Sequence, residues 1–119
     1  MLHFRQHLEE GRTNTFTHEG NDYDLYKLNG LIKDNPITQV PISKLIWIFK
    51  YDDPNKDQPE RIKTADISNP IVLLHWEGQI VVLDGLHRLK KAQQNDMISL
   101  PARYASEEDL EKCKLKRDH

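Results

Sequence analysis

The stretch QIVVLDGLHRLKKAQQ, residues 79–94, decides the fold of this chain. Its first part holds a short apolar run, residues 80–83, that is rich in β-branched side chains and is typical of a buried strand. The run stops at Asp84-Gly85, and residues 86–94 then place apolar side chains at helical spacing. The sequence therefore predicts a strand that passes through a tight turn directly into a helix.

The first turn of this helix combines features that bind anions. The first amides of a helix have no intrahelical acceptor, and they lie at the positive end of the helix dipole. His87 and Arg88 add an imidazole and a guanidinium to the same turn. Such a turn suits phosphate or another anion. Asp84 could cap the helix, position an arginine or bind a metal, and the sequence leaves these roles open.

The length and composition limit the classes of protein to consider. A chain of 119 residues predicts one domain over residues 1–119, with a polar N-terminal arm over 1–20 and a C-terminal helix and tail over 106–119. The formal net charge is −2, although 30% of the residues are charged. This balance argues against a protein that coats nucleic acid by charge alone, and it leaves a local basic patch open.

The number of cysteines and the length of the apolar runs indicate the cellular compartment of the protein. The single cysteine, Cys113, excludes an internal disulfide and fits a reducing compartment. Because it lies in a lysine-rich segment, we expect an incidental surface thiol. The start of the chain has no apolar core of signal-peptide length, and no apolar run is long enough to span a bilayer. We therefore expect a cytoplasmic protein with no membrane partner.

The part of the chain before residue 50 predicts helices, a loop and one strand. We expect a short helix over 2–10, a loop over 11–20 and a helix from Asp22 to the Asn-Pro pair at 35–36. A strand over 37–42 follows, and its proline indicates a position at a sheet edge. Residues 44–49 are apolar, and their pattern does not decide between helix and strand.

The second half predicts alternating short helices and strands. They are a helix over 59–66, a strand over 71–75, its antiparallel partner over 79–83, a strand over 98–104, and a helix from Ser106 to about Leu115. Pro101 indicates that the 98–104 strand also lies at an edge. Together these elements predict an α/β chain of the α+β type, with a small mixed sheet and flanking helices.

The segment YDDPNKDQPE, residues 51–60, carries the strongest loop signal, with two prolines and four carboxylates. One interpretation is a solvated loop without a role in chemistry. The other is that Asp52, Asp53 or Glu60 reaches the anion site as a base or a metal ligand. The sequence does not place any of these carboxylates relative to the helix.

The order of elements and the segments VVLDGLHRLKKA and ISLPARY resemble the ParB/sulfiredoxin superfamily. This fold is shared by the amino-terminal domain of the partition protein ParB, by sulfiredoxin and by ParB-like free serine kinases. The resemblance covers residues 36–105. The pentapeptide Asp84-Gly85-Leu86-His87-Arg88 is similar to the signature in which a His-Arg pair and helix amides hold nucleotide phosphates. The resemblance implies the same fold and a nucleotide site at this turn.

Two departures from the superfamily narrow the expected function. In sulfiredoxin the residue between glycine and histidine is the reactive cysteine, whereas here it is Leu86. Partition ParB continues into a long DNA-binding helical domain, whereas this sequence ends 15 residues after Tyr104. The resemblance therefore favours the stand-alone ParB-like proteins, which bind nucleotides and act as phosphotransferases, nucleotide hydrolases or nucleases.

The resemblance implies ATP or another nucleoside triphosphate as the ligand, with Mg²⁺ bridging its phosphates. The residues expected to contact the nucleotide are Gly85, Leu86, His87, Arg88, Asn69 and Lys91. His87 and Asp84 are also expected in the reaction, and Asp84 would orient Arg88 or bind the metal. Phosphoryl transfer depends mainly on positioning and charge neutralisation, which this set of residues would supply.

Three alternatives to a phosphotransferase or hydrolase stay open. A non-catalytic module could recognise a nucleotide, DNA or a partner protein without turnover. A metal-dependent nuclease would use the same site but needs a basic track for the nucleic-acid backbone, which the net charge of −2 disfavours. A purely structural role would have Arg88 pair with Asp84 and leave Lys91 facing solvent.

Overall fold

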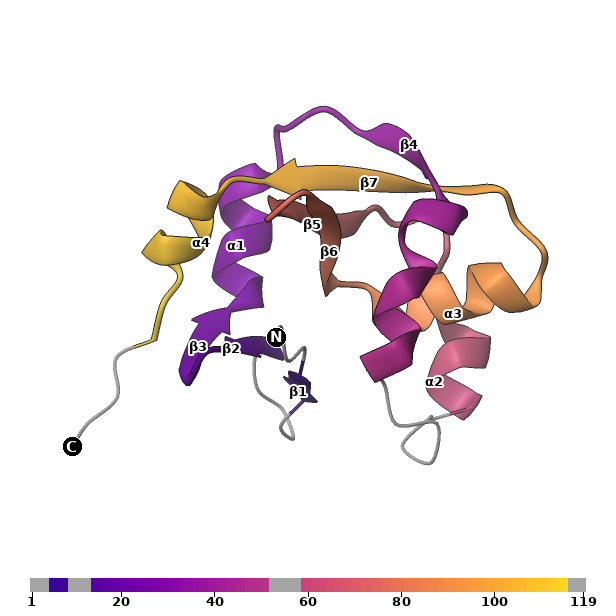
Figure 1. Ribbon diagram of the computed structural model, residues 1–119, viewed down its shortest axis with the longest axis horizontal. Helices are drawn as coiled ribbons and strands as arrows, with labels where there is room; N and C mark the ends of the chain where they lie inside the picture. Colours follow the sequence, from indigo (N-terminus) through magenta and orange to yellow (C-terminus); the bar gives the residue numbers. More distant parts are fainter. Residues whose placement is uncertain (1–4, 9–13, 52–58, 116–119) are drawn as a thin grey trace.

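The computed structural model describes residues 5–8, 14–51 and 59–115, with side chains from residue 15 to 50 and from 59 to 115 (Figure 1). It is a mixed α+β structure, as the sequence predicts, but it has two sheets where the sequence predicts one small mixed sheet. The smaller sheet has the order β1-β2-β3, and its strands are antiparallel. Its strands are β1 (Arg5–Leu8), β2 (Asn14–His18) and β3 (Asn21–Asp24).

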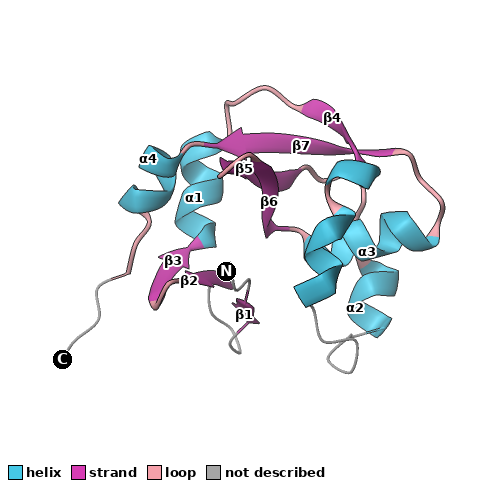
Figure 2. Cartoon of the chain, viewed as in Figure 1, coloured by secondary structure: helices cyan, strands magenta, loops and turns pink. Residues whose placement is uncertain are grey.

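The larger sheet has the order β4-β7-β5-β6, in which β5 and β7 are parallel and the other neighbours are antiparallel. Its strands are β4 (Thr38–Pro41), β5 (Ile71–Trp76), β6 (Gln79–Asp84) and β7 (Ser99–Ala105). The helices are α1 (Leu25–Ile32), α2 (Pro59–Thr64), α3 (Leu86–Gln94) and α4 (Glu107–Lys112), with 3₁₀ turns η1 (Ile42–Lys44) and η2 (Ile46–Tyr51). Helices α1 and α4 lie toward one end of the molecule, and α2 and α3 toward the other (Figure 2).

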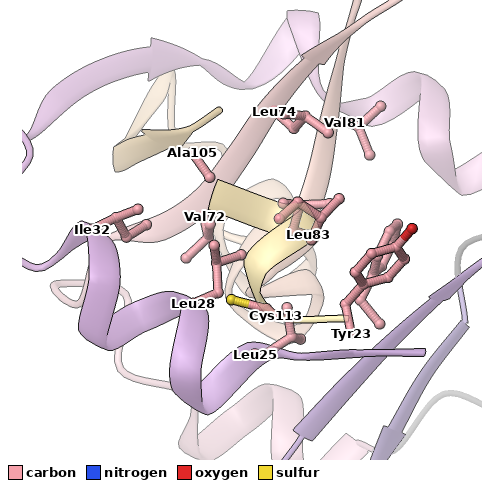
Figure 3. Close-up of a cluster of buried hydrophobic side chains, with 12 residues drawn as sticks. Tyr23, Leu25, Leu28, Ile32, Val72, Leu74, Val81, Leu83, Ala105 and Cys113 are labelled. Atoms are coloured by element: carbon pink, nitrogen blue, oxygen red, sulfur yellow. The ribbon is translucent and has the colours of Figure 1, made fainter. Parts of the chain in front are cut away.

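Both faces of the larger sheet are buried, which explains the continuous apolar runs of β5 and β6. Val72 and Leu74 point to a cluster that includes residues of α1, α4 and the smaller sheet (Figure 3). Ile71 and Leu73 point the other way, to a cluster that includes Leu89 of α3 and residues of η1 and η2. Because successive side chains of a strand point to opposite faces, strand β5 contributes to both hydrophobic cores.

The hairpin and the helix after it are confirmed. Strands β5 and β6 pair antiparallel, and their turn places Glu77 and Gly78 at φ values of 48° and 79°. Helix α3 begins directly after Gly85, and α2 and β4 lie where the sequence predicts them. Strand β4 is at the edge of its sheet, as its proline indicates.

The N-terminal predictions are wrong. Residues 5–8 form strand β1 and not a helix, and the expected loop over 11–20 contains strand β2. Thr15, Phe16, Thr17 and His18 alternate between partly exposed and buried positions, so β2 follows the period of a strand. Its pairing with β3 supplies the stabilisation that short polar strands lack on their own.

Helix α1 begins at Leu25 and not at Asp22, because Asp24 is its N-cap. The Asp24 carboxylate accepts a hydrogen bond from the Lys27 amide at 3.1 Å, and residues before it belong to β3. Helix α4 begins with the expected capping box between Ser106 and Asp109, but it ends at Lys112. Residues 44–49, which the sequence left undecided, form 3₁₀ turns.

Two further expectations are wrong. Strand β7 is central and not an edge, and it tolerates Pro101 because β5 pairs with β7 only from Ala102 onward. Cys113 is not a surface thiol: it is 1% exposed and packs in the cluster with α1. Burial also raises the pKa of this thiol. Within the described residues, no helix is long and apolar enough to cross a membrane.

Candidate phosphate-binding turn

The turn between β6 and α3 depends on a glycine. Gly85 is the N-cap of α3 and has a φ of 112°, which side-chain-bearing residues rarely adopt. A Cβ atom at this position would lie 2.8 Å from Ile71 Cβ and still closer to Ile71 Cγ2. The close approach of β5 and the backbone conformation therefore both require glycine. As a glycine, the N-cap residue has no side chain with which to cap the helix start.

The Asp84 side chain joins α1 to α3. The residue is 8% exposed, and its Oδ2 accepts a hydrogen bond of 3.0 Å from Asn29 Nδ2. Its Oδ1 lies 3.8 Å from Arg88 Nη2. Asn29 also donates to the Leu25 carbonyl, at 2.8 Å, which fixes its amide on α1. Asp84 is therefore placed to orient Arg88, one of the roles left open by the sequence.

The Arg88 guanidinium is anchored on the main chain. Its Nη1 donates to the carbonyl oxygens of Pro70, at 2.7 Å, and Asn69, at 3.2 Å. These carbonyls directly precede β5, so Arg88 ties the start of that strand to the first turn of α3. About a fifth of the Arg88 side chain is exposed. Its Nη1 group is thus occupied by the protein, and Asn69 enters the site through its carbonyl.

Lys91, one turn further along α3, has a comparable anchoring role. Its Nζ donates to the carbonyl oxygens of Lys63 and Ala65, both at 2.8 Å. These groups lie at the C-terminal end of α2, where a cation is favourable for the helix dipole. Lys91 is therefore not a solvent-facing lysine.

A carboxylate that the sequence did not single out lies within the field of both cations. Asp66 accepts hydrogen bonds from the hydroxyl and the amide of Ser68, at 2.5 and 3.0 Å. These bonds lower the pKa of Asp66, and the charges of Arg88 and Lys91 lower it further. Asp66 follows α2 in a turn that carries no motif, so only the folded structure reveals its position.

The structure brings together most of the residues expected at the nucleotide site. Asp84, Arg88, Asn69 and Lys91 make the contacts described above around α3. His87 lies in the same first turn and is partly buried. Leu86, also partly buried, packs against the core cluster of Leu89.

Of the acidic candidates from the 51–60 segment, only Glu60 lies within the described residues. Glu60 lies in the first turn of α2 with an exposed side chain, and its carbonyl accepts the Thr64 hydroxyl at 2.8 Å. Asp52 and Asp53 lie outside the described residues. Among those described, no three histidine, cysteine or acidic side chains gather as a metal site.

Comparison with known proteins gives a similarity of fold. No family model matches this chain, and no curated protein matches it. A crystal structure of sulfiredoxin from Arabidopsis thaliana is similar with a TM-score of 0.41 and 19% sequence identity. The match covers 65% of this chain and 94% of that one. Sulfiredoxin is one of the proteins that the sequence resembles, and this similarity concerns the fold and not the activity.

Proposed function

We propose that this protein binds the phosphates of a nucleotide at the first turn of α3. The observation that carries the proposal is the helix start itself, where the N-cap residue is a glycine in the left-handed conformation and so has no side chain of its own to cap the helix. The first amides of a helix have no intrahelical acceptor, so they can donate to a phosphate oxygen. The preferred ligand is ATP or another nucleoside triphosphate, and the preferred reaction is phosphoryl transfer or hydrolysis.

Arg88 and Lys91 support the proposal through their positive charge. Arg88 Nη1 and Lys91 Nζ already donate to main-chain carbonyls. Their charges nevertheless act on the exposed Asp66 carboxylate. A phosphate at the helix start would be attracted by the same cations. His87, in the first turn, is the side chain proposed to contact it.

Magnesium fits this site as a companion of the phosphates better than as a resident ion. Mg²⁺ keeps several waters and is held by one or two carboxylates together with substrate phosphates. Asp84 suits a metal poorly, because Asn29 donates to one of its oxygens and Arg88 faces the other. The exposed Asp66 is the better carboxylate for a phosphate-bound ion. Bound Mg²⁺ would supply charge neutralisation during phosphoryl transfer.

The identity of the general base for phosphoryl transfer stays a prediction. Glu60, Asp52 and Asp53 are the carboxylates that the sequence offers, and each would have to take a proton from an acceptor hydroxyl or from water. The geometric requirement is a distance of about 2.6–3.2 Å, or one bridging water, in the complex with substrate.

One observation favours a second candidate, a module that binds a nucleotide without turnover. Arg88 and Lys91 of α3 are both anchored on carbonyls of other segments. Such contacts stabilise the packing of α3 against α2 and β5 whether or not chemistry occurs. In such a module the bound nucleotide would act as a regulatory ligand and would not be converted to a product.

Calorimetric titration tests the proposal. The wild type is titrated with ATP, CTP, GTP and ADP, each with and without Mg²⁺, alongside Arg88→Ala, His87→Ala and the control Lys112→Ala. Lys112 is an exposed cation at the end of α4, so the control removes the same charge elsewhere. We expect Arg88→Ala to weaken binding about tenfold, equivalent to about 1.4 kcal/mol, because it removes a positive charge near the phosphate. We expect a smaller loss for His87→Ala and none for Lys112→Ala.

Thermal unfolding of each variant shows whether it is folded in the titration. The proposal fails if the wild type binds none of the nucleotides at millimolar concentration, or if folded Arg88→Ala binds as tightly as wild type. A phosphate-release assay on the same samples separates the two candidates. Turnover supports the enzyme, and binding without turnover supports the module.

A further inference from the structure

A second pocket lies on the face of the larger sheet opposite α3. It has a volume of about 290 Å³ and opens between the smaller sheet, the β5–β6 hairpin and α4. Its apolar walls are Phe16, Tyr23, Leu74, Trp76, Val81 and Leu110. Three of these six side chains are aromatic, so the pocket presents ring faces and edges to an occupant.

A buried imidazole faces this pocket without a hydrogen-bond partner. His18 lines the pocket and is 7% exposed, and neither of its ring nitrogens has a hydrogen bond within the described structure. Glu19 Oε1 lies 3.7 Å from His18 Nε2, beyond hydrogen-bond distance. The ring stacks on Phe16 at 6.3 Å and meets the edge of Trp76 at 5.2 Å, both between centroids. Both nitrogens are enclosed in this structure, so the ring would have to rotate to present one of them to an occupant. A buried polar group without a partner costs free energy, so a hydrogen bond from the occupant to His18 would favour this rotation.

The rim of the pocket is acidic. Glu19, Glu107 and Glu111 line it together with one cation, Lys114. Lys114 Nζ lies 3.7 Å from Glu111 Oε1, which leaves the set with more negative than positive charge. These carboxylates also act on Tyr23 in the pocket wall. Burial raises the pKa of Tyr23, and the negative charges of Glu111 and Glu19 raise it further. An anion would be repelled here, and a cation would be attracted.

We infer that this pocket binds an alkylammonium group, whose N–H donates to His18 and whose charge lies among the aromatic rings and rim carboxylates. Ring faces attract cations, and an imidazole nitrogen with a lone pair accepts an N–H. A neutral apolar occupant would leave the carboxylates without compensation. The ammonium could come from a lysine side chain of a partner polypeptide or from a free small amine.

The test uses NMR of ¹⁵N-labelled protein titrated with n-butylammonium, tetramethylammonium, 1-butanol and Nα-acetyl-lysine methylamide. Both ammonium ions carry charge, but only n-butylammonium has N–H groups for His18. We expect n-butylammonium to shift the His18 ring nitrogens and the Trp76 indole, and to bind more tightly than tetramethylammonium or 1-butanol. If the lysine derivative binds more tightly than n-butylammonium, the source is a polypeptide; the reverse order indicates a free amine.

Three variants check the roles of the side chains. Glu111→Gln removes a rim charge and should weaken n-butylammonium about two- to fivefold, as expected for a partly exposed ion pair. Glu108→Gln is the matched control, because Glu108 is exposed on the same helix but does not line the pocket. His18→Phe keeps an aromatic ring without an acceptor and should abolish the preference for n-butylammonium over tetramethylammonium.

The inference is overturned if n-butylammonium causes no shift of His18 or Trp76 at tens of millimolar, or if 1-butanol binds equally well. It is also overturned if Glu111→Gln binds n-butylammonium as tightly as Glu108→Gln does. Because Glu111 is exposed, this comparison remains valid even if His18→Phe does not fold.

Discussion

Replacing Gly85 by alanine tests whether the turn before α3 is fixed by backbone geometry. The positive φ of 112° costs a residue with a Cβ about 1–2 kcal/mol. The new Cβ would also lie 2.8 Å from Ile71 Cβ, and overpacking of this kind costs about 1–3 kcal/mol. The sum is about 2–5 kcal/mol, a large part of the roughly 5–15 kcal/mol that stabilise a typical domain.

The matched control is Gly78→Ala. Gly78 has a φ of 79°, but a Cβ there would meet no atom within 4 Å. Gly78→Ala therefore carries the conformational cost without the steric one, and the difference between the two variants measures the contact with Ile71. Urea unfolding gives both free energies. In a thermal scan we expect Gly85→Ala to lower Tm by about 10–20 °C.

A double-mutant cycle makes the argument specific. Ile71→Ala removes the methyl group nearest to the new Cβ, so the combined loss with Gly85→Ala should be smaller than the sum of the single losses. If Gly85→Ala were no more destabilising than Gly78→Ala, or if the two losses at Gly85 and Ile71 simply added, the steric reasoning would be refuted.

Three other predictions concern buried polar groups. Asn29→Ala deprives Asp84 of its 3.0 Å donor and should lower the free energy of unfolding by about 1–3 kcal/mol in urea; an unchanged midpoint would contradict this role. The Cys113 thiol, 1% exposed, should react with a thiol reagent only on unfolding, and Cys113→Ala should bind nucleotide as wild type does. Burial raises the pKa values of Cys113 and Tyr23, so the folded state holds these protons more tightly. Stability should therefore fall as pH rises above the unfolded values of about 8.5 and 10; a flat profile in urea titrations would count against it.

The hairpin and α3 could be predicted because their signals are local. Two apolar runs flank a glycine-containing turn, and the sequence Asp84-Gly85 interrupts the second run before a helical pattern begins. A strand that is buried on both faces does not need alternating apolar and polar residues, so a continuous apolar run was sufficient to predict it. The α+β class then followed from the order of the elements.

The smaller sheet could not be predicted in the same way. Strand β2 holds one large apolar residue, Phe16, and its stability comes from pairing with β1 and β3. Its buried His18 is a polar residue in a position that apolar patterning does not identify. Propensity is overridden by tertiary contacts most easily in such short polar segments.

At the candidate site, sequence reasoning found the residues but not their contacts. The spacing of Asp84 and Arg88 allowed for their pairing, whereas the carbonyls of Asn69 and Pro70 as acceptors depend on how β5 approaches α3. Asn29 lies 55 positions from Asp84, and nothing in the sequence connects them. These contacts are long-range in the sequence, and they determine which N–H groups of Arg88 can still donate to a ligand.

The most direct measurement of the central claim is a ¹⁵N-amide NMR titration with ATP and Mg²⁺. If the first turn of α3 holds phosphate, the amides of Leu86, His87 and Arg88 should show the largest shifts, and the amides of the pocket at His18 should show none. Inorganic phosphate should move the same three amides at higher concentration. Saturating shifts confined to other segments, or no shifts at millimolar ATP, would contradict the account.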